Sequence, residues 1–393
     1  MKTPSRQTCT MKTTTLTMGT LILTAGLAAA TPAPKERADA AFDAFFSEGS
    51  FAYMNCAFAQ HGKTRYTFAR KAAPEMLATN KNTRKKDFDA PFDADTPLHV
   101  ASVTKTVTAV LLAQLAEEGK LTLRDPVKRH IPLFPDEKVL IIHLMTHTSG
   151  WRNKTGHSAN PAQNEKFYAT LFKEAEIVER FQYMSQGYDI LAEIIERVTG
   201  EADVASVAAA RIFEPLGMKH TTMAPHQGQS GMCTTAGDLV LLGNDLLRSL
   251  LKRKTGVLTP EGADLLFRPV LKPEFHRTPA FFIHSGEIGF SQYFADCNSM
   301  SAVGHAGATG CYFLIDPGLD TVQVILSDGS SLDFRSVDQN FSRMNAVMLS
   351  CFSDSPAPFR PTHPATADVR DAAAKEHDAL ESRRAAGEKV TAP

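Results

Sequence analysis

His99-Val100-Ala101-Ser102-Val103-Thr104-Lys105, followed by an apolar run from Val107 to Leu115, is the most informative stretch of this sequence. Ser102 and Lys105 are three residues apart, so on a helix they share one face and the amine can reach the hydroxyl. A serine hydroxyl is a poor nucleophile until a neighbouring base removes its proton, and burial of a lysine lowers its pKa toward that of a base. The S-x-x-K spacing therefore predicts a serine nucleophile with an activating lysine.

The residues after Ser102 have the pattern of a helix. Apolar side chains recur at helical spacing at Val103, Val107, Val110, Leu111 and Leu115. Gly119 stands where a C-terminal cap belongs. The N-terminus of a helix favours developing negative charge, which suits a serine that attacks a carbonyl group.

The S-x-x-K pattern is weak evidence when it stands alone. Ser249-Leu250-Leu251-Lys252 matches it by chance, near the end of an expected helix with basic residues around it. A single match most often marks a solvated helix face. Other motifs in the sequence are needed to indicate which of the two serines, Ser102 or Ser249, is the nucleophile.

The composition is that of an ordinary soluble protein. Of the 393 residues 43% are hydrophobic and 22% charged, which allows one large domain or two in close contact. The formal net charge is -1 and no basic run is interleaved with aromatic residues. Nucleic acid is therefore not an expected partner.

The N-terminus has the features of an export signal. Basic residues precede an apolar stretch from Leu16 to Leu27, and Ala28-Ala29-Ala30 supplies the small residues of a cleavage site. The apolar stretch is shorter than the roughly 20 residues of a membrane-spanning helix. We expect cleavage after Ala30, which leaves a periplasmic or secreted protein with no stable membrane anchor. Met11 is an alternative start, because it keeps the same apolar segment.

The cysteines give no indication of a metal site. Outside the signal they are Cys56, Cys233, Cys297, Cys311 and Cys351, and no C-x-x-C or Cys/His ligand spacing occurs. An odd set leaves at least one free thiol. We predict buried thiols with no particular disulfide, no metal and no cofactor.

Hydrophobic patterns along the chain predict a mixed fold. Helices are expected at 35–48, 188–198, 203–213, from 235 onward and at 333–352, and strands within 51–69 on both sides of a His61-Gly62 turn and at 280–284, 301–307, 312–315 and 321–326. Strands and helices near both ends, with helices between them, indicate a sheet assembled from both ends of the chain and a helical insertion.

The expected organisation is a signal at 1–30, a folded region at 31–352 and a tail at 353–393. Within the folded region, the sheet part takes about 35–120 and 255–352, and the helical part about 121–254. The tail is rich in proline, alanine and charge. It has little to bury, which predicts disorder or a loose helix.

Further motifs follow the S-x-x-K stretch in a fixed order. They are Gly119-Lys120-Leu121-Thr122-Leu123-Arg124-Asp125-Pro126-Val127, His143-Leu144-Met145-Thr146-His147-Thr148-Ser149-Gly150, Tyr183-Met184-Ser185, Gly187-Tyr188 with Ile194-Ile195-Glu196-Arg197-Val198-Thr199-Gly200, Pro215-Leu216-Gly217-Met218, and Gly304-His305-Ala306-Gly307-Ala308-Thr309-Gly310. Together, from about Lys35 to Phe352, the chain resembles the serine β-lactamase-related hydrolases of the class C type, which include D,D-peptidases and esterases.

The resemblance implies an α+β fold, an α/β sandwich in which helices flank an antiparallel sheet. It also implies a largely helical second domain, with the active site between the two. Ser102 would be the acylated nucleophile, Lys105 its activating partner and Tyr183 the group that shuttles protons to and from the serine and the leaving group. His147-Thr148-Ser149-Gly150 would be a structural turn and not a second nucleophile.

The resemblance also implies the residues around the substrate. The backbone N–H groups of Ser102 and Ala308 would form the oxyanion hole, and Gly307 and Ala308 would line the substrate site. His305 would occupy the cationic position of the third motif. Ser185 would contact the substrate from the second motif.

Two of these residues depart from the family pattern. Ser185 stands where asparagine is usual, and its shorter hydroxyl offers one donor in place of an amide, so we expect esters to be better substrates than β-lactams. His305 stands where lysine is frequent. An unperturbed imidazole titrates near pH ~6.5, whereas a lysine stays protonated to about pH 10, so a positive charge at His305 is expected to be lost near neutrality.

The sequence therefore favours an exported serine hydrolase that acts through an acyl-serine on a small ester, amide, lactam or peptide. The alternative is a catalytically weak or inactive penicillin-binding-like protein that binds or senses cell-wall fragments. Intact Ser102, Lys105 and Tyr183 favour the enzyme, whereas Ser185 keeps the alternative open. Nothing in the sequence indicates an oligomeric state.

Overall fold

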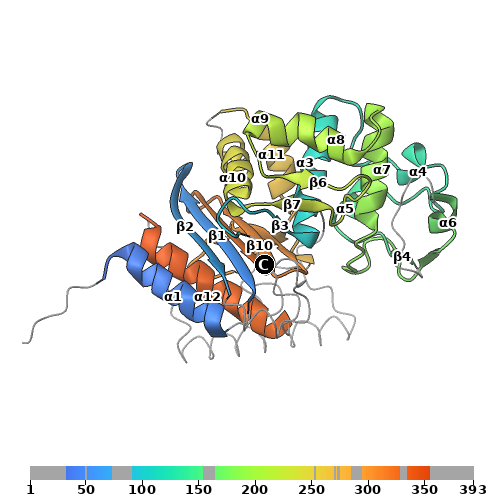
Figure 1. Cartoon of the computed structure of the whole chain (residues 1–393). Helices are drawn as coiled ribbons and strands as arrows, with labels where there is room; N and C mark the ends of the chain where they lie inside the picture. Colours follow the sequence, from blue (N-terminus) through green and yellow to red (C-terminus); the bar gives the residue numbers. More distant parts are fainter. Residues whose placement is uncertain are drawn as a thin grey trace, which may run out of the picture. The chain divides into compact units, whose positions relative to one another are not determined.

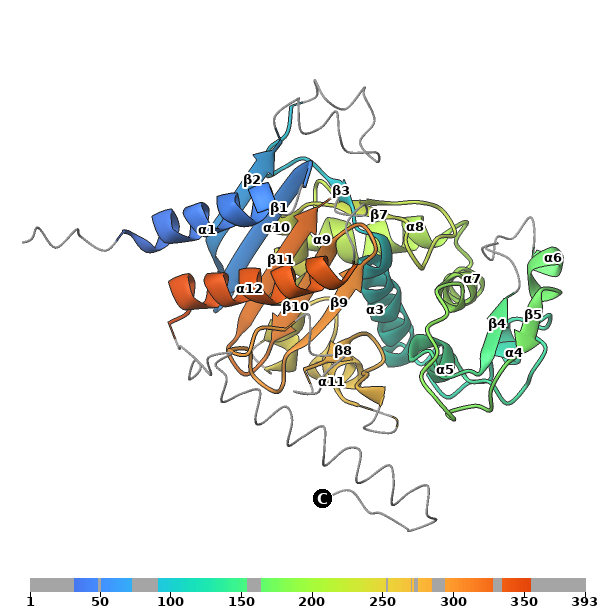
Figure 2. The same cartoon turned by 90° about the horizontal axis from the view of Figure 1, so that it is seen from below.

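An antiparallel sheet of six strands in the order β2-β1-β11-β10-β9-β8 receives strands from both ends of the chain (Figures 1 and 2). The strands are β1 Tyr53–Gln60, β2 Lys63–Lys71, β8 Phe282–Ile283, β9 Val303–Gly307, β10 Cys311–Asp316 and β11 Thr321–Ser327. β1 and β2 join through a His61-Gly62 turn, where both residues have positive φ. β1 pairs with β11, with Met54 opposite Ser327 and Gln60 opposite Thr321. The sequence-based fold class is confirmed.

The structure is a computed structural model of the chain. It describes residues 32–48, 51–72, 91–153, 164–251, 254–269, 271, 275–284, 294–327 and 334–354. The predicted signal at 1–30 and almost all of the predicted tail lie outside these residues. The division of the folded region into a sheet part and a helical part stays a prediction.

Helices cover both faces of the sheet. α1 (Pro34–Glu48) and α12 (Phe334–Phe352) pack against each other on one face, and α10 (Ala236–Leu250) lies on the other against β1 and β11 (Figure 2). Side chains alternate between two cores along each strand. Phe313 and Val324 join the core on the α10 side, whereas Tyr312 and Ile325 join the core on the side of α1 and α12.

The remaining elements lie beside the sheet. The helices are α3 Thr104–Glu117, α4 Val127–His130, α5 Ile141–Met145, α6 Asn164–Tyr168, α7 Gly187–Thr199, α8 Val204–Ala208 with a π-helical turn at Ala209–Phe213, α9 Glu214–Leu216 and α11 Pro260–Phe267. Short strands form a three-stranded sheet from β3 Leu98–His99, β7 Met232–Thr234 and β6 Thr222–Met223, and a pair from β4 Trp151–Asn153 and β5 Leu171–Lys173. These strands of two or three residues were not predicted, because so short a segment shows no hydrophobic period.

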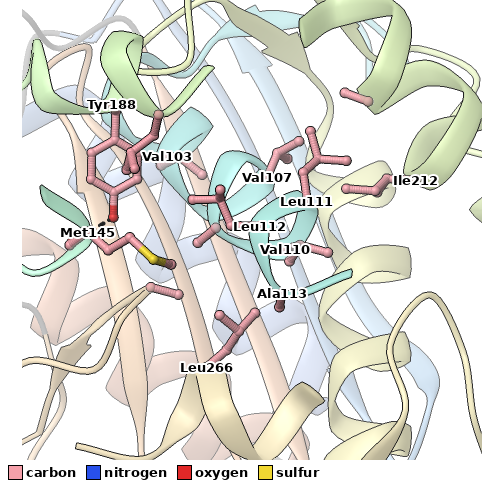
Figure 3. Close-up of a cluster of buried hydrophobic side chains, with 14 of the residues drawn as sticks. Val103, Val107, Val110, Leu111, Leu112, Ala113, Met145, Tyr188, Ile212 and Leu266 are labelled. Atoms are coloured by element: carbon pink, nitrogen blue, oxygen red, sulfur yellow. Dashed lines mark hydrogen bonds between the residues drawn. The ribbon is translucent and has the colours of Figure 1, made fainter. Parts of the chain in front are cut away.

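α3 is the helix that the S-x-x-K stretch predicts, and it is buried on every side. All residues from Thr104 to Leu115 are buried, including the charged Lys105. Figure 3 shows Val107, Leu111 and Leu112 of α3 in a cluster with Tyr188 and other apolar side chains. A helix that is buried all round belongs to the core of a large domain, so the backbone beside Ser102 is held on all sides.

Candidate active site

Ser102 lies in the 3-10 turn Ala101–Val103, which connects β3 to α3. Its side chain is partly buried. Ala101 has a φ of 45°, a conformation that side chains other than glycine rarely adopt and that is found at functional turns. Thr104 stabilises the turn, because its hydroxyl donates to the Ala101 carbonyl at 2.6 Å and accepts from Met232 N–H at 3.1 Å. Ser102 therefore lies in a turn that hydrogen bonds of Thr104 stabilise and whose backbone is strained at Ala101.

Lys105 contacts Ser102 directly. Its Nζ donates to Ser102 Oγ at 2.9 Å and to the Gln229 carbonyl at 2.9 Å. Burial lowers the pKa of Lys105, and Tyr183 and Asp189 oppose part of this effect. Asp189 accepts from the Gln229 backbone N–H at 3.2 Å, so it fixes the carbonyl that orients the amine. The geometry and the lowered pKa suit a base.

Tyr183 is beside the same amine. Lys105 Nζ lies 5.2 Å from the centroid of the Tyr183 ring. The tyrosine is 36% exposed, which leaves it open to a substrate. Its ring centroid is 4.2 Å from that of His147. The segment on either side of Tyr183 is fixed by two hydrogen bonds, from Gln182 N–H to the His147 carbonyl at 2.8 Å and from Met184 N–H to His147 Nδ1 at 3.2 Å.

His147 thus positions Tyr183 from the turn 147–150. Burial lowers the pKa of His147 well below its ordinary value, and the positive charges of Arg277 and Lys105 lower it further. A neutral imidazole whose Nδ1 accepts a hydrogen bond carries its proton on Nε2. The histidine of this turn contributes the ring on which Tyr183 packs, and its Nδ1 accepts a hydrogen bond from Met184 N–H.

The third motif lies on β9 and the turn after it. A Cβ on Gly307 would approach the Val100 carbonyl oxygen to 2.2 Å, so β9 touches the backbone before Ser102 and only glycine fits. Thr309 Oγ1 donates to the His99 carbonyl at 2.7 Å. The exposed Ala308 lies between these two contacts, which hold its backbone beside the nucleophile turn.

His305 differs from the sequence-based expectation about its charge. It is 1% exposed, and its Nδ1 lies 2.9 Å from the Ala306 carbonyl oxygen. Burial lowers the pKa of His305 well below 6.5, and Arg277 and Lys105 lower it further. The imidazole is therefore neutral at neutral pH, and the fixed positive charge of the region does not come from this position.

Comparisons with known proteins identify the family of this chain. Residues 38–346 match the family model described as Beta-lactamase. The chain belongs to the beta-lactamase family.

Relatives within the family carry several descriptions. Penicillin-binding protein 4* of Bacillus subtilis is 34% identical over 142 residues, which are 33% of this chain and 31% of the relative. The D-alanyl-D-alanine-carboxypeptidase/endopeptidase AmpH of Escherichia coli is 27% identical over 150 residues, which are 34% of this chain and 39% of the relative. The chain thus spans about a third of the length of these curated relatives.

The fold extends over more of the chain than the sequence identity does. The solved structure of EstCE1, described as a hydrolase with promiscuous acyltransferase activity, superposes with a TM-score of 0.62 at 19% identity and covers 79% of this chain and 98% of that one. At this identity the likeness shows the fold of the beta-lactamase family and not the substrate.

Ser185, the predicted residue of the second motif, makes few contacts with the other predicted site residues. It is partly buried and stands just before α7. Its backbone carbonyl accepts from Tyr188 N–H at 2.9 Å. Within the described residues, no hydrogen bond of its hydroxyl joins it to Ser102 or Lys105.

The second S-x-x-K match has a structural role at its serine. Ser249 is fully buried near the end of α10, where its hydroxyl donates to the Leu258 carbonyl at 2.9 Å and accepts from Gly256 N–H at 3.2 Å. Lys252 lies outside the described residues. In the described residues, the contact between a lysine amine and a serine hydroxyl at this spacing is that of Lys105 with Ser102.

Two residues near the site were missed in the sequence. Arg277 precedes β8 and is buried, with its Cζ 4.2 Å from the centroid of the Phe282 ring. No motif surrounds it, so only burial reveals it. His147 belonged to a recognised turn, but nothing in the sequence indicated that its ring contacts Tyr183.

The described residues contain no cluster of histidine, cysteine or acidic side chains that could hold a metal ion. The cysteines outside the predicted signal, Cys56, Cys233, Cys297, Cys311 and Cys351, are free thiols. Over the same part of the chain, no helix is both long and apolar enough to cross a membrane.

Proposed function

We propose that this protein is an exported serine acyl-hydrolase that forms an acyl-enzyme at Ser102. The observation that carries the proposal is the 2.9 Å contact between Lys105 Nζ and Ser102 Oγ, made by an amine that is fully buried in α3. Burial lowers the pKa of Lys105, which increases the fraction of neutral amine that can accept the serine proton. Burial of a charged lysine destabilises the folded state, and a buried titratable residue with a shifted pKa is typical of an active site.

The reaction would proceed in two halves. In the first, Ser102 Oγ attacks the substrate carbonyl while its proton passes to Lys105, and the leaving group takes a proton through Tyr183. In the second, water attacks the acyl-serine and returns the proton to Ser102. Tyr183 suits the transfer to and from solvent, because it is both close to Lys105 and partly exposed.

The oxyanion would form at the junction of α3 and β9. The N–H groups of Ser102 and Ala308 are the proposed donors, and the contacts of Gly307 and Thr309 with the backbone before Ser102 hold them in place. Removing one such donor from a serine hydrolase costs on the order of 10² to 10³ in rate.

Esters are the proposed substrates in preference to β-lactams. Ester hydrolysis needs the nucleophile, the proton shuttle and the oxyanion hole. Recognition of a lactam or peptide also needs a group that binds the acyl-amide side chain, and Ser185 offers only a short hydroxyl there. The description of EstCE1 as a hydrolase with promiscuous acyltransferase activity supports acyl transfer on this fold.

Labelling with a fluorophosphonate probe tests the nucleophile. We expect one labelled peptide, containing Ser102, and no labelling of Ser102→Ala. Ser249→Ala is the matched control, since it removes the other S-x-x-K serine, and it should be labelled like the wild type. Labelling that persists in Ser102→Ala would refute the assignment.

Turnover distinguishes the enzyme from a binding protein. The purified chain would be assayed with 4-nitrophenyl esters, a chromogenic cephalosporin and D-alanyl-D-alanine peptides. Ester turnover above lactam turnover is expected. Stoichiometric labelling of Ser102 without turnover of any substrate would favour the penicillin-binding-like sensor.

Export is proposed from the first 30 residues alone. Expression of the full chain with a C-terminal tag in a bacterial host should give a periplasmic product whose N-terminus is Thr31. A cytoplasmic product that retains Met1 or Met11 would contradict it.

A further inference from the structure

Two successive backbone carbonyls lie against the start of α3. The Gly228 carbonyl accepts a hydrogen bond from Thr108 Oγ1 at 2.8 Å, and the Gln229 carbonyl accepts one from Lys105 Nζ at 2.9 Å. Thr108 and Lys105 are three residues apart, so they share one face of the helix. The position of residues 228 and 229 therefore determines where the Lys105 amine is held.

Asp189 of α7 holds the same two residues from the other side. Its Oδ1 accepts from the Gln229 backbone N–H at 3.2 Å, and its Oδ2 accepts from Gln229 Nε2 at 2.5 Å. A Cβ on Gly228 would overlap the Tyr188 carbonyl oxygen, so this segment packs closely on the first turn of α7. Two donors of one residue fix its orientation as well as its position. Asp189 thus fixes Gln229, whose carbonyl receives the amine.

The orientation of the amine matters for its proposed task. A neutral amine has two N–H donors and one lone pair, and rotation about the Cε–Nζ bond exchanges their directions. The lone pair must point at Ser102 when the hydroxyl proton is transferred. A hydrogen bond from Lys105 to the Gln229 carbonyl restricts this rotation, because it occupies one N–H. The carbonyl that Asp189 fixes therefore aligns the base with the nucleophile.

The carboxylate also opposes the charge that the amine acquires. Asp189 is fully buried in the first turn of α7, where the helix N-terminus stabilises negative charge. When the Ser102 proton passes to Lys105, the amine becomes a buried cation, which needs an opposite charge close by. Burial lowers the pKa of Lys105, and the negative charge of Asp189 raises it. The same carboxylate can therefore position the amine and stabilise its protonated form.

The other titratable groups around Lys105 come from separate parts of the chain: Tyr183 before α7, Tyr188 in α7, Arg277 before β8, His147 in the turn 147–150 and His305 on β9. Tyr183 raises the pKa of Lys105 and Arg277 lowers it. Burial keeps the two histidines neutral. On the far side of Asp189, burial and Glu193 raise the pKa of Tyr168, and Asp189 adds to their effect.

We propose that Asp189 is a positioning residue of the serine hydrolase reaction. It fixes Gln229 so that Lys105 is aligned with Ser102, and its charge stabilises the amine that has accepted the serine proton. The proposal rests on the function proposed above. It assigns a role in the reaction to a residue that was not among the predicted site residues.

Removal of the charge tests the electrostatic part of the proposal. Asp189→Asn keeps the size of the side chain. With 4-nitrophenyl acetate, it should lose at least about tenfold in kcat/KM, because a catalytic group is misaligned. In the acid limb of the pH profile, kcat/KM rises as Lys105 loses its proton. This limb should move to lower pH in Asp189→Asn, since Asp189 raises the pKa of Lys105.

Asp238→Asn is the matched control. Asp238 is a buried carboxylate in the first turn of α10, and it accepts from the His220 backbone N–H at 2.8 Å and from Thr221 Oγ1 at 2.7 Å. Asp238→Asn should keep kcat/KM within about threefold and leave the acid limb in place. If the limb stayed at the wild-type pH in Asp189→Asn, or moved equally in both variants, the role of Asp189 would be structural alone and the proposal would be overturned.

Asp189→Glu separates position from charge. It keeps the carboxylate but is longer by one methylene group, which displaces Gln229 and its carbonyl. We expect a loss of at least about tenfold in kcat/KM, with the acid limb at the wild-type pH. This variant also tests the positioning role if Asp189→Asn does not fold. Wild-type kcat/KM in Asp189→Glu would refute positioning through Gln229.

A direct titration of Lys105 separates this proposal from the hydrolase function. In protein labelled with ¹³C at lysine Cε, the NMR signal that is missing from Lys105→Met reports the protonation of Lys105. It should titrate at lower pH in Asp189→Asn than in the wild type and in Asp238→Asn. Equal titration in all three proteins would overturn the proposed action of Asp189, even if esters are hydrolysed. A shifted titration in a protein whose Ser102 is never labelled would support that action and refute the hydrolase function alone.

Discussion

Replacement of Gly307 by alanine should separate the geometry of the site from the stability of the fold. The new Cβ would lie 2.2 Å from the Val100 carbonyl oxygen, where an ordinary contact needs about 3.4 Å. β9 and the backbone before Ser102 must therefore move apart by about 1 Å. Both proposed oxyanion donors, Ser102 N–H and Ala308 N–H, lie within two residues of the displaced atoms.

The magnitude follows from that displacement. Overpacking of a core typically costs about 1 to 3 kcal/mol of unfolding free energy. A shift of about 1 Å in a catalytic group costs on the order of 10² in rate, and loss of one oxyanion donor costs on the order of 10² to 10³. We expect Gly307→Ala to lose at least about 10² in kcat/KM with an ester substrate and about 1 to 3 kcal/mol of stability.

Gly243→Ala is the matched control for steric overlap. Its Cβ would lie 2.6 Å from Val322 Cγ1, in the contact between α10 and β11. It should lose a similar amount of stability, measured by urea unfolding, and keep kcat/KM within about threefold. If Gly307→Ala also kept kcat/KM within threefold, the reasoning about close approach at the oxyanion site would be refuted.

Three further outcomes follow from buried polar groups. Lys105→Met should lose about 10² to 10⁴ in kcat/KM, the usual contribution of a general base, without a loss of stability in urea; retained turnover would contradict the role of the amine. Folding stability should fall as pH drops below about 6.5, because the unfolded chain protonates His147 and His305 while the folded one does not. The slope should reach about 1.4 kcal/mol per pH unit for each histidine, and His305→Gln should reduce it; an unchanged slope in that variant would oppose this account. Ser249→Ala should lose about 1 to 3 kcal/mol of stability, since the Leu258 carbonyl and Gly256 N–H lose their partner, with activity in the folded protein unchanged; wild-type stability would show that the buried hydroxyl contributes little.

Much of the fold could be predicted from local pattern. The strands beside His61-Gly62 and the helix that ends at Gly200, in the left-handed conformation with φ 77°, both have a clear hydrophobic period and a residue that ends them. β3, β6 and β7 could not be predicted, because strands of two or three residues show no hydrophobic period and the sheet they form depends on the distant pairing of β3 with β7. The strand β3 pairs with residues 233 and 234, more than a hundred positions away.

The candidate site could be predicted where its residues lie a few positions apart in a recognisable motif. Ser102 and Lys105 are neighbours on one helix turn, and the structure brings them to 2.9 Å. The burial of His305, and hence its neutral state, depends on residues such as Phe282 that share no motif with it. Arg277 has no local signal at all, since an isolated arginine in a sequence is most often exposed.

The pairing of β1 with β11 has a consequence for the order of folding. Gln60 and Thr321 are opposite each other although about 260 residues separate them in the chain. Pairing over such a distance gives a high contact order, which slows folding. Until β11 has been synthesised, β1 presents a largely apolar strand with one open edge, the kind of surface that recruits other chains. A nascent or truncated chain that ends before β11 is therefore the form of this protein that most needs a chaperone.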